Sequence, residues 1–294
     1  TSFGNSFDIA VEIATIREAE KMDCLFAEHR PDVVFHAAAH KHVPLMEHNP
    51  DEAIKNNIWG TMNVVNASQK YNVKNFVLIS SDKAVNPTNI MGATKRFAEM
   101  IVQSRRGVSS TRFAAVRFGN VLGSSGSVVP MFEKQIEQGG PVTVTHSEIT
   151  RFFMTIPEAV QLVLQAAVMA KDGEIFVLDM GEPVRILQLA ETMIRFSGLR
   201  PYEDIDIVFT GLRPGEKLYE ELLMNEEGLE STANSRIFIG HQPHITVQEV
   251  DRMCKILDDA VNKNDKNNLM HVMQEVVPTY KPDFLSCKNN HTLF

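Results

Sequence analysis

The chain has 294 residues, of which 44% are hydrophobic and 22% are charged, and this composition is typical of a globular protein. The net charge of -8 argues against a nucleic-acid partner, and three scattered cysteines are too few for a disulfide framework or a zinc site. No hydrophobic run reaches the roughly 20 residues that cross a bilayer, and no signal peptide opens the sequence. We therefore expect a protein of a reducing compartment with no membrane segment in this chain.

The first half of the chain alternates hydrophobic strands with amphipathic helices, which predicts a doubly wound parallel sheet in the α/β class. The helices are recognised by apolar residues three or four positions apart, as at Ile54, Ile58 and Met62. In chain order we predict a helix at 16–28, a strand at 33–37, a helix at 51–71, a strand at 75–80, a helix at 90–106 and a strand at 111–117.

The second half begins after Asn120, where the composition changes and a loop of glycine and serine residues covers 123–127. The predicted elements that follow are a helix at 129–138, a strand at 142–145, helix 156–170, strand 175–179, helix 186–197, strand 205–210 and helices 216–223, 247–260 and 265–276. We predict three parts: a cofactor-binding lobe with the catalytic loop at 1–120, a substrate-binding lobe at 121–240 and a helical extension at 241–294.

A polar loop follows the predicted strand 75–80 and begins with Ser81, Asp82 and Lys83. In open α/β sheets ligands bind outside the carboxyl ends of the strands, so these side chains stand at the expected pocket. An isolated Ser-Asp-Lys turn is more often a solvated charge pair. Here it lies between a buried strand and a helix on which Met91 and Lys95 share one face, and this position favours an active site.

Four segments together resemble one enzyme superfamily: Ser81 to Lys95, His36-Ala-Ala-Ala-His-Lys-His-Val-Pro-Leu-Met46, Arg117-Phe-Gly-Asn-Val-Leu-Gly123 and Arg213-Pro-Gly-Glu-Lys-Leu-Tyr-Glu-Glu-Leu222. They resemble the extended short-chain dehydrogenases/reductases, whose signature is Ser/Thr followed by Tyr-x-x-x-Lys. Met91 stands at the tyrosine position. This departure and the Asp82-Lys83 pair resemble the large, membrane-anchored UDP-N-acetylglucosamine 4,6-dehydratases of bacterial polysaccharide biosynthesis. The resemblance covers residues 10 to 240, approximately.

The resemblance implies a hydro-lyase that oxidises C4 of the sugar, removes the C5 proton, eliminates water from C6 and returns the hydride. Asp82 is then the general acid for the C6 hydroxyl, and Lys83 is the base for the C5 proton. Lys95 is expected to hold the nicotinamide ribose. Because a thioether exchanges no proton, Met91 cannot replace the tyrosine, and we hypothesise that Ser81 relays the C4 hydroxyl proton. Alternatively, Met91 is a core gap filler.

The resemblance also implies a nicotinamide cofactor, NAD or NADP, and a UDP-N-acetylhexosamine substrate. Arginine can clamp a phosphate bidentately, a carboxylate can accept from ribose hydroxyls, and Gly/Ser loops offer amides to a diphosphate. The expected cofactor residues are His36, Ala37, Ala38, Ala39, Asn57 and Lys95. The expected substrate residues are Lys41, Asn120, Ser124, Ser127, Thr143, Arg151, Arg213 and Glu216. No metal site is expected, since the spacing of His40, His42, Glu47 and His48 fits no standard ligand set.

Gly4 is the only glycine between Thr1 and Trp59, so a Gly-x-Gly-x-x-Gly phosphate loop cannot be built there. We interpret the chain as an amino-terminally truncated part of a cytoplasmic protein or of the cytoplasmic domain of an inner-membrane protein, with the first strands upstream. The sequence does not show whether the cofactor is NAD or NADP, or whether the configuration at C5 is retained or inverted.

Two other functions are compatible with the sequence. One is a sugar-nucleotide C4 epimerase, and the other is a cofactor-free binding or assembly module. A homo-oligomer is expected, because the superfamily commonly dimerises through a helix pair, for which helices 51–71 and 90–106 are the candidates.

Overall fold

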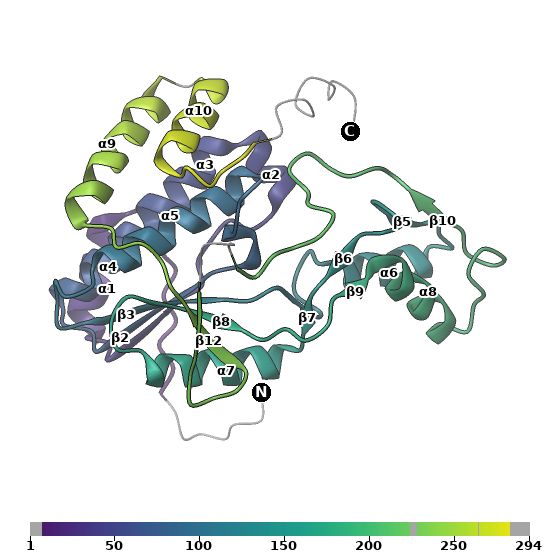
Figure 1. Ribbon diagram of the computed structural model, residues 1–294, viewed down its shortest axis with the longest axis horizontal. Coiled ribbons are helices and arrows are strands. Elements are labelled where there is room, and N and C mark those ends of the chain that lie inside the picture. The colour runs from purple at the N-terminus through teal and green to yellow at the C-terminus, as the bar shows by residue number, and fades with distance from the viewer. Residues whose placement is uncertain (1–7, 224–227, 264, 283–294) are drawn as a thin grey trace.

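The computed structural model describes residues 8–223, 228–263 and 265–282, so Gly4, Cys287 and most of the predicted polar tail lie outside the described residues. A six-stranded sheet runs through the larger part of the molecule (Figure 1). Four parallel strands stand in the order β1 (Val33–His36), β2 (Asn75–Ile79), β3 (Arg112–Arg117) and β8 (Glu174–Leu178). β12 (Ile237–Gly240) and β11 (Leu229–Ser231) extend it as antiparallel strands. The predicted Rossmann-like α/β class is confirmed, with a mixed sheet.

Helices cover both faces of this sheet, because alternate residues of its central strands point into two separate cores. Phe76, Leu78 and Phe113 pack against α4 (Thr61–Lys70) and α5 (Ile90–Ser104), and α1 (Ala19–His29) joins the same side. Val77 and Val116 pack on the opposite face against α7 (Ile156–Met169). Burial on both faces explains the nearly continuous hydrophobic runs of β2 and β3.

The predicted helix 51–71 is continuous but irregular. It begins as α3 (Pro50–Ile54), widens into the π-helical turn η1 (Lys55–Gly60) and ends as α4. π turns inside α-helices are frequent at functional sites, and this turn carries the buried Asn57.

The carboxyl-terminal helices α9 (Val247–Asn262) and α10 (Lys266–Val276) form a hairpin that packs on α5 (Figure 1). A capping box between Thr246 and Glu249 starts α9, and the Asp265 side chain caps α10. Val250, Leu257 and Met273 enter the same core as α5. One of the two helices considered for an oligomer interface is therefore covered within the chain itself, while oligomerisation stays a prediction.

A smaller lobe stands beside the main sheet and has its own core. It contains α6 (Val128–Glu137), β5 (Val142–Val144), α8 (Ile186–Phe196) and β10 (Ile207–Phe209), and β5 pairs with β10 in parallel. Short strands join the lobes: β4 (Asn120–Val121) pairs with β7 (Phe153–Met154), and β6 (Thr150–Arg151) with β9 (Val184–Arg185). The chain returns to the main sheet at β8 and again at β12, so the range 121–240 contributes to both lobes.

The predicted helix 216–223 is wrong, because residues 210–223 form an irregular loop. Gly215 has φ +72, and its carbonyl accepts hydrogen bonds from Thr88 Oγ1 at 2.8 Å and Asn89 Nδ2 at 3.0 Å. These contacts with Thr88 and Asn89 hold the segment in an irregular path, although its apolar residues are spaced as in a helix.

The short α2 (Val43–His48) was not predicted. Within the described residues, the structure contains no helix with the length and hydrophobicity that a membrane span requires.

Candidate active site

The loop after β2 brings the predicted residues Ser81, Asp82 and Lys83 into direct contact. Ser81 begins the single turn η2 (Asp82–Ala84), and its Oγ accepts a hydrogen bond from the Lys83 amide at 3.2 Å. The same hydroxyl donates to Asp82 Oδ1 at 2.9 Å, and Lys83 Nζ lies 3.0 Å from that oxygen. A hydroxyl, a carboxyl group and an amine thus form one hydrogen-bonded series at the carboxyl end of a parallel strand.

Helix α5 presses its amino terminus against this loop. The Asn89 side chain caps the helix by accepting from the Gly92 amide at 2.8 Å, and Glu47 Oε1 accepts from the Ile90 amide at 2.6 Å. Burial raises the pKa of Glu47, while its hydrogen bond from Ile90 lowers it. A Cβ on Gly92 would lie 2.1 Å from the Lys83 carbonyl oxygen, so only glycine allows this approach.

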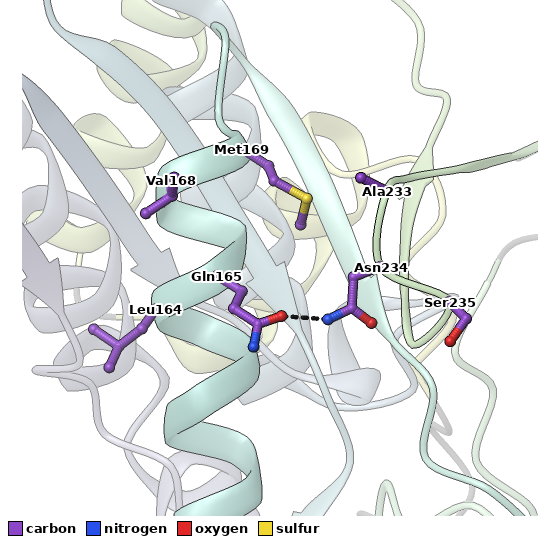
Figure 2. A pocket seen from close by; sticks show the side chains of 7 residues that line it. All are labelled: Leu164, Gln165, Val168, Met169, Ala233, Asn234 and Ser235. Carbon is purple, nitrogen blue, oxygen red and sulfur yellow. Dashed lines mark hydrogen bonds between the residues drawn. The ribbon is translucent and has the colours of Figure 1, made fainter.

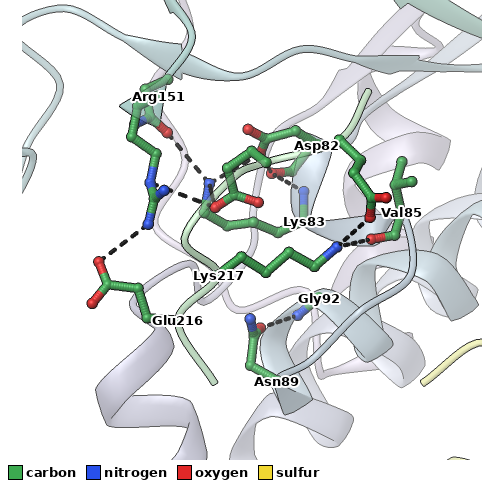
Figure 3. A network of polar contacts seen from close by, with 12 residues as sticks. Asp82, Lys83, Val85, Asn89, Gly92, Arg151, Glu216 and Lys217 are labelled. Carbon is green, nitrogen blue, oxygen red and sulfur yellow. Dashed lines mark hydrogen bonds and ion pairs between the residues drawn. The ribbon is translucent and has the colours of Figure 1, made fainter. Parts of the chain in front are cut away.

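A chain of charges extends from the loop into the second lobe (Figure 3). Lys83 Nζ lies 3.2 Å from Glu220 Oε1, and Arg151 bridges Glu220 at 3.6 Å and Glu216 at 3.1 Å. We call Asp82, Lys83, Arg151, Glu216 and Glu220 the pocket network. Among the described residues, Asp82 Oδ2 and Glu220 Oε2 are buried without a hydrogen-bond partner. Buried oxygens of this kind are rare in folded proteins and indicate a place for a ligand or a proton.

The pocket network fixes the charge of Lys83. Burial alone would lower the pKa of the Lys83 amine, but the carboxylates of Asp82 and Glu220 raise it more strongly, against the opposing charge of Arg151. The net effect is a pKa above the ordinary lysine value. A raised pKa favours the ammonium form of Lys83, which has no lone pair with which to accept a proton.

Two cavities open on the pocket network. One has a volume of about 190 Å³ and the other of about 120 Å³, and Arg151, Arg213 and Glu216 line both. The larger cavity brings together most of the predicted substrate residues: Asn120, Ser127, Thr143, Arg151, Arg213 and Glu216. Ser124 and Lys41 do not line either cavity, and Lys41 lies exposed after β1.

The residues predicted to face a cofactor divide into two groups. The His36 side chain turns into the core, where its Nε2 lies 2.9 Å from Thr61 Oγ1, and burial lowers its pKa to about 3. Ala37 and Ala38 are exposed and Ala39 is half-buried, and all three lie in the loop after β1.

The predicted cofactor residue Asn57 is fully buried and joins that loop to α5. Its Oδ1 accepts from the His40 amide at 2.8 Å, and its Nδ2 donates to the His40 carbonyl and to Thr94 Oγ1, each at 3.0 Å. Asn57 therefore holds the loop against α5, while a role towards a cofactor stays a prediction.

Lys95 and Met91 sit beneath the catalytic loop. Lys95 Nζ donates to the carbonyl of Ile79, the last residue of β2, and burial lowers its pKa to about 8 although Glu99 opposes the shift. Met91 is 3% exposed and belongs to the hydrophobic core, as the gap-filling alternative expects.

A second, buried polar network surrounds Glu99 of α5, and we call Ser80, Arg96, Glu99 and Arg117 the core network. Glu99 Oε1 accepts from Ser80 and Arg117, each at 2.7 Å, and Oε2 accepts from Arg96 at 3.0 Å and Arg117 at 2.7 Å. Burial would raise the pKa of Glu99, but the two guanidinium groups lower it to about 2.

Two other hollows are lined by no charged side chain. An apolar groove of about 360 Å³ begins at the carboxyl ends of β1 and β2 and is lined by Phe35, Ile79, Phe118, Val121, Ile156 and Val160, among others. A wider hollow of about 640 Å³ lies between α7 and the turn at 233–235, where Gln165 and Asn234 are hydrogen-bonded (Figure 2). No group of three His, Cys, Asp or Glu side chains in the described part of the chain is arranged to hold a metal ion.

A family profile described as "Polysaccharide biosynthesis protein" matches residues 3–242. The chain belongs to this family. It is 60% identical over 238 residues to the probable polysaccharide biosynthesis protein EpsC of Bacillus subtilis, covering 81% of this chain and 40% of the relative. It is 53% identical to the capsular polysaccharide biosynthesis protein CapD of Staphylococcus aureus, covering 92% of this chain and 45% of the relative. The chain thus spans less than half the length of these two relatives.

Enzymes appear among the relatives at lower identity. The chain is 36% identical to a UDP-N-acetylglucosamine 4,6-dehydratase (inverting) of Campylobacter jejuni, over 77% of this chain and 66% of the relative. It is 39% identical to a UDP-glucose 4-epimerase of Rickettsia canadensis, over 73% of this chain and 62% of the relative.

Solved structures agree with the fold. Pen from Bacillus thuringiensis is 40% identical and covers 80% of this chain and 73% of its own, with a TM-score of 0.73. A dTDP-glucose 4,6-dehydratase from Streptomyces venezuelae with NAD bound has a TM-score of 0.64 at 18% identity, covering 71% of this chain and 69% of its own. The chain thus belongs to the polysaccharide biosynthesis family, and it shares its fold with sugar-nucleotide epimerases and dehydratases.

The sequence interpretation assigned no role to Glu220 or Glu99. Glu220 belongs to the Arg213 to Leu222 motif, but the predicted helix over this segment did not indicate that its side chain would face the catalytic loop. The sequence feature that could have indicated a role is the presence of three glutamates within the six residues after Arg-Pro-Gly. For Glu99 the signal is a charged residue inside an otherwise buried helix face.

Proposed function

We propose that the protein to which this chain belongs dehydrates UDP-N-acetylglucosamine, in the cytoplasm, to a UDP-4-keto-6-deoxy-N-acetylhexosamine. The observation that carries the proposal is the hydrogen-bonded series Ser81, Asp82 and Lys83 at the end of β2, beside a cavity lined by Arg151 and Arg213. Two guanidinium groups supply the charge that a nucleoside diphosphate needs. Glu216, which lines the same cavity, would accept from ribose hydroxyls.

The contact between Ser81 and Asp82 provides a path for the first proton. Oxidation of C4 releases the proton of the C4 hydroxyl, which Ser81 Oγ can receive while passing its own proton to Asp82 Oδ1 across 2.9 Å. Asp82 then carries the proton that the departing C6 hydroxyl needs to leave as water. The proton lost at C4 and the hydroxyl lost at C6 thus account for the water that is eliminated.

A nicotinamide dinucleotide, when bound, would accept the C4 hydride and return it to C6. The chain's residues fit its nicotinamide end: the exposed loop of Ala37 and Ala38 gives close access to the backbone, and the apolar groove beside Ile79 and Phe118 suits a flat ring. Lys95, held at the Ile79 carbonyl, supplies an amine at the same strand end. Because Met91 stands at the tyrosine position, no titrating group is available there. This supports assignment to the dehydratase subgroup, in which proton transfer would use the loop residues Ser81 and Asp82.

Proton NMR of UDP-N-acetylglucosamine incubated with the purified protein and NAD or NADP in deuterated water tests this function. We expect a 4-keto-6-deoxy product that carries deuterium at C5. Recovery of unchanged substrate with both cofactors would contradict the proposal and favour a binding or assembly module.

A C4 epimerase is the second candidate, because a relative of 39% identity carries that name. The same incubation separates the two, since an epimerase would give UDP-N-acetylgalactosamine without loss of water. The buried Met91 and the Asp82-Lys83 contact favour the dehydratase, because epimerisation requires no acid at C6.

A further inference from the structure

Glu220 is the one carboxylate of the pocket network that approaches Lys83 from the second lobe. Its side chain is 3% exposed, and it comes from the loop between β10 and β11. Oε1 makes both ion pairs, with Lys83 Nζ at 3.2 Å and Arg151 Nε at 3.6 Å. Oε2 is buried and accepts no hydrogen bond from any described residue. Glu220 therefore has one oxygen engaged and one available.

The location of Glu220 is suited to substrate contact. It lines the cavity of about 120 Å³ together with Lys83, Arg151, Arg213 and Glu216. This cavity shares the two arginines with the larger one, so a diphosphate bound to them would bring the attached sugar towards Lys83 and Glu220.

The charged groups facing Lys83 are Asp82 on η2, Glu220 on the 210–223 loop and Arg151 on β6, with Asn120 Oδ1 at 3.3 Å. Before the reaction, two carboxylates against one guanidinium favour the protonated amine, and once Asp82 has taken the C4 proton, Glu220 remains as its counterion. Lys83 is therefore suited to stabilise a negative oxygen and unsuited to accept a proton, and the base that the C5 step needs must be another group.

We propose that Glu220 is the base that removes the C5 proton, and that Lys83 remains an ammonium ion which stabilises the enolate oxygen at C4. This inference rests on the dehydratase function proposed above. It reassigns the C5 step from Lys83, the residue that the sequence pattern indicates, to a carboxylate about 137 positions further along the chain.

The C5–H bond breaks, its proton forms an O–H bond on Glu220, and its electron pair forms the enolate whose oxygen faces the Lys83 ammonium. The enolate re-forms the C4 ketone and expels the C6 hydroxyl, which takes the proton from Asp82 and leaves as water. After C6 is reduced, Glu220 returns a proton to C5. Since Glu220 exchanges its proton with solvent, C5 acquires deuterium in deuterated water.

Two variants separate the alternatives. Glu220→Gln keeps the shape of the side chain but cannot accept a proton, and Lys83→Arg keeps the positive charge but cannot act as a base at neutral pH. We expect Glu220→Gln to slow deuterium incorporation at C5 by about 10²- to 10⁴-fold. We expect Lys83→Arg to slow it by about 10-fold or less, because the charge is kept.

The neighbouring Glu221→Gln is the matched control. Glu221 is exposed, and it pairs with Lys217 at 2.9 Å, outside the cavity. This variant should exchange C5 as the wild type does. A Glu220→Gln protein that exchanges C5 within 10-fold of the wild type, or a Lys83→Arg protein that loses exchange while Glu220→Gln keeps it, would overturn the inference.

Two further measurements keep the outcomes distinct. Formation of reduced nicotinamide, followed by its absorbance, reports C4 oxidation, and it should persist in Glu220→Gln because that step precedes C5 exchange. NMR titration of the Lys83 side chain without substrate should show its pKa lowered by about 1 to 3 units in Glu220→Gln. If the wild type gives no product, the proposed function fails. If the wild type reacts and Glu220→Gln still exchanges C5, only the role of Glu220 as the base fails. If the pKa of Lys83 does not move, the role of Glu220 in keeping Lys83 protonated fails.

Discussion

Two charge networks come within two residues of each other at Ser80 and Asp82, and they differ in how completely their hydrogen-bonding groups are satisfied. In the core network, both oxygens of Glu99 accept two hydrogen bonds each, and Glu99 and Arg117 have no exposed side-chain surface. In the pocket network, three carboxylates meet two cations, and Asp82 and Glu220 each keep one oxygen without a partner among the described residues. A satisfied network stabilises the fold, whereas an unsatisfied one keeps capacity for a ligand or a proton.

The largest change in stability is expected from Glu99→Gln in the core network. The substitution removes the negative charge that lies 2.7 Å from the fully buried Arg117, which should cost about 3–5 kcal/mol in the free energy of unfolding. Urea denaturation measures this, with the exposed Glu221→Gln as a control that should change by less than about 0.5 kcal/mol. Equal midpoints for the two variants would remove the distinction between the networks.

Gly92→Ala should have the next largest effect. Alanine favours helices over glycine by about 1 kcal/mol, but the new Cβ would lie 2.1 Å from the Lys83 carbonyl, and a backbone atom cannot move aside cheaply. We expect a net loss of about 1–3 kcal/mol, as in other overpacked sites. Because α5 and the catalytic loop must separate, C5 exchange should fall as well. An unchanged melting temperature together with unchanged exchange would contradict the contact.

Lys95→Met should stabilise the protein at pH 7, on the order of 1 kcal/mol, because it removes a buried amine. Burial lowers the pKa of Lys95 from 10.5 to about 8, so between these values the unfolded chain binds more protons than the folded one. The wild type therefore gains stability as pH rises from about 8 to 10.5, and the advantage of the variant shrinks there. Denaturation at pH 7 and pH 10 tests the sign. A variant that is less stable at pH 7 would show that the Ile79 contact outweighs desolvation.

The smallest change in stability is expected from Asp82→Asn, although it should have one of the largest effects on activity. The asparagine keeps the side-chain shape, and Lys83 retains Glu220 as a counterion, so the free energy of unfolding should change by less than about 1 kcal/mol. The dehydration rate should fall by about 10²- to 10⁴-fold, because the C6 hydroxyl loses its acid. A loss of several kcal/mol would mean that the pocket network is as structural as the core network.

Much of the fold could be predicted because the core strands carry long apolar runs, as from Phe76 to Ile79. The antiparallel strand β12 could not, since Ile237 to Gly240 is short and finds its partner β8 about 60 residues earlier. The π turn at 55–60 preserves the helical spacing of apolar residues and leaves no distinct sequence signal. The loop at 210–223 adopts its path because of contacts with Thr88 and Asn89, which no local pattern reveals.

The candidate active site also has features that the sequence could predict and features that it could not. Ser81, Asp82 and Lys83 could be located because the end of a predicted parallel strand is a defined place. The convergence of Asn120, Thr143 and Arg213 on one cavity agrees with the predicted substrate set, while their role stays a prediction. The charge state of Lys83 could not be predicted, because it depends on Glu220, whose proximity only the tertiary structure provides.

Strand β1 has practical consequences for handling the protein. Within the described residues it is one of the two edge strands of the main sheet. Val33 is 45% exposed and Phe35 is 43% exposed, and the neighbouring apolar groove continues along α7. Unpaired strand edges beside apolar surface promote association between molecules. Purity, concentration and ionic strength will therefore govern how long a solution of this polypeptide stays monodisperse, and light scattering should accompany every kinetic experiment.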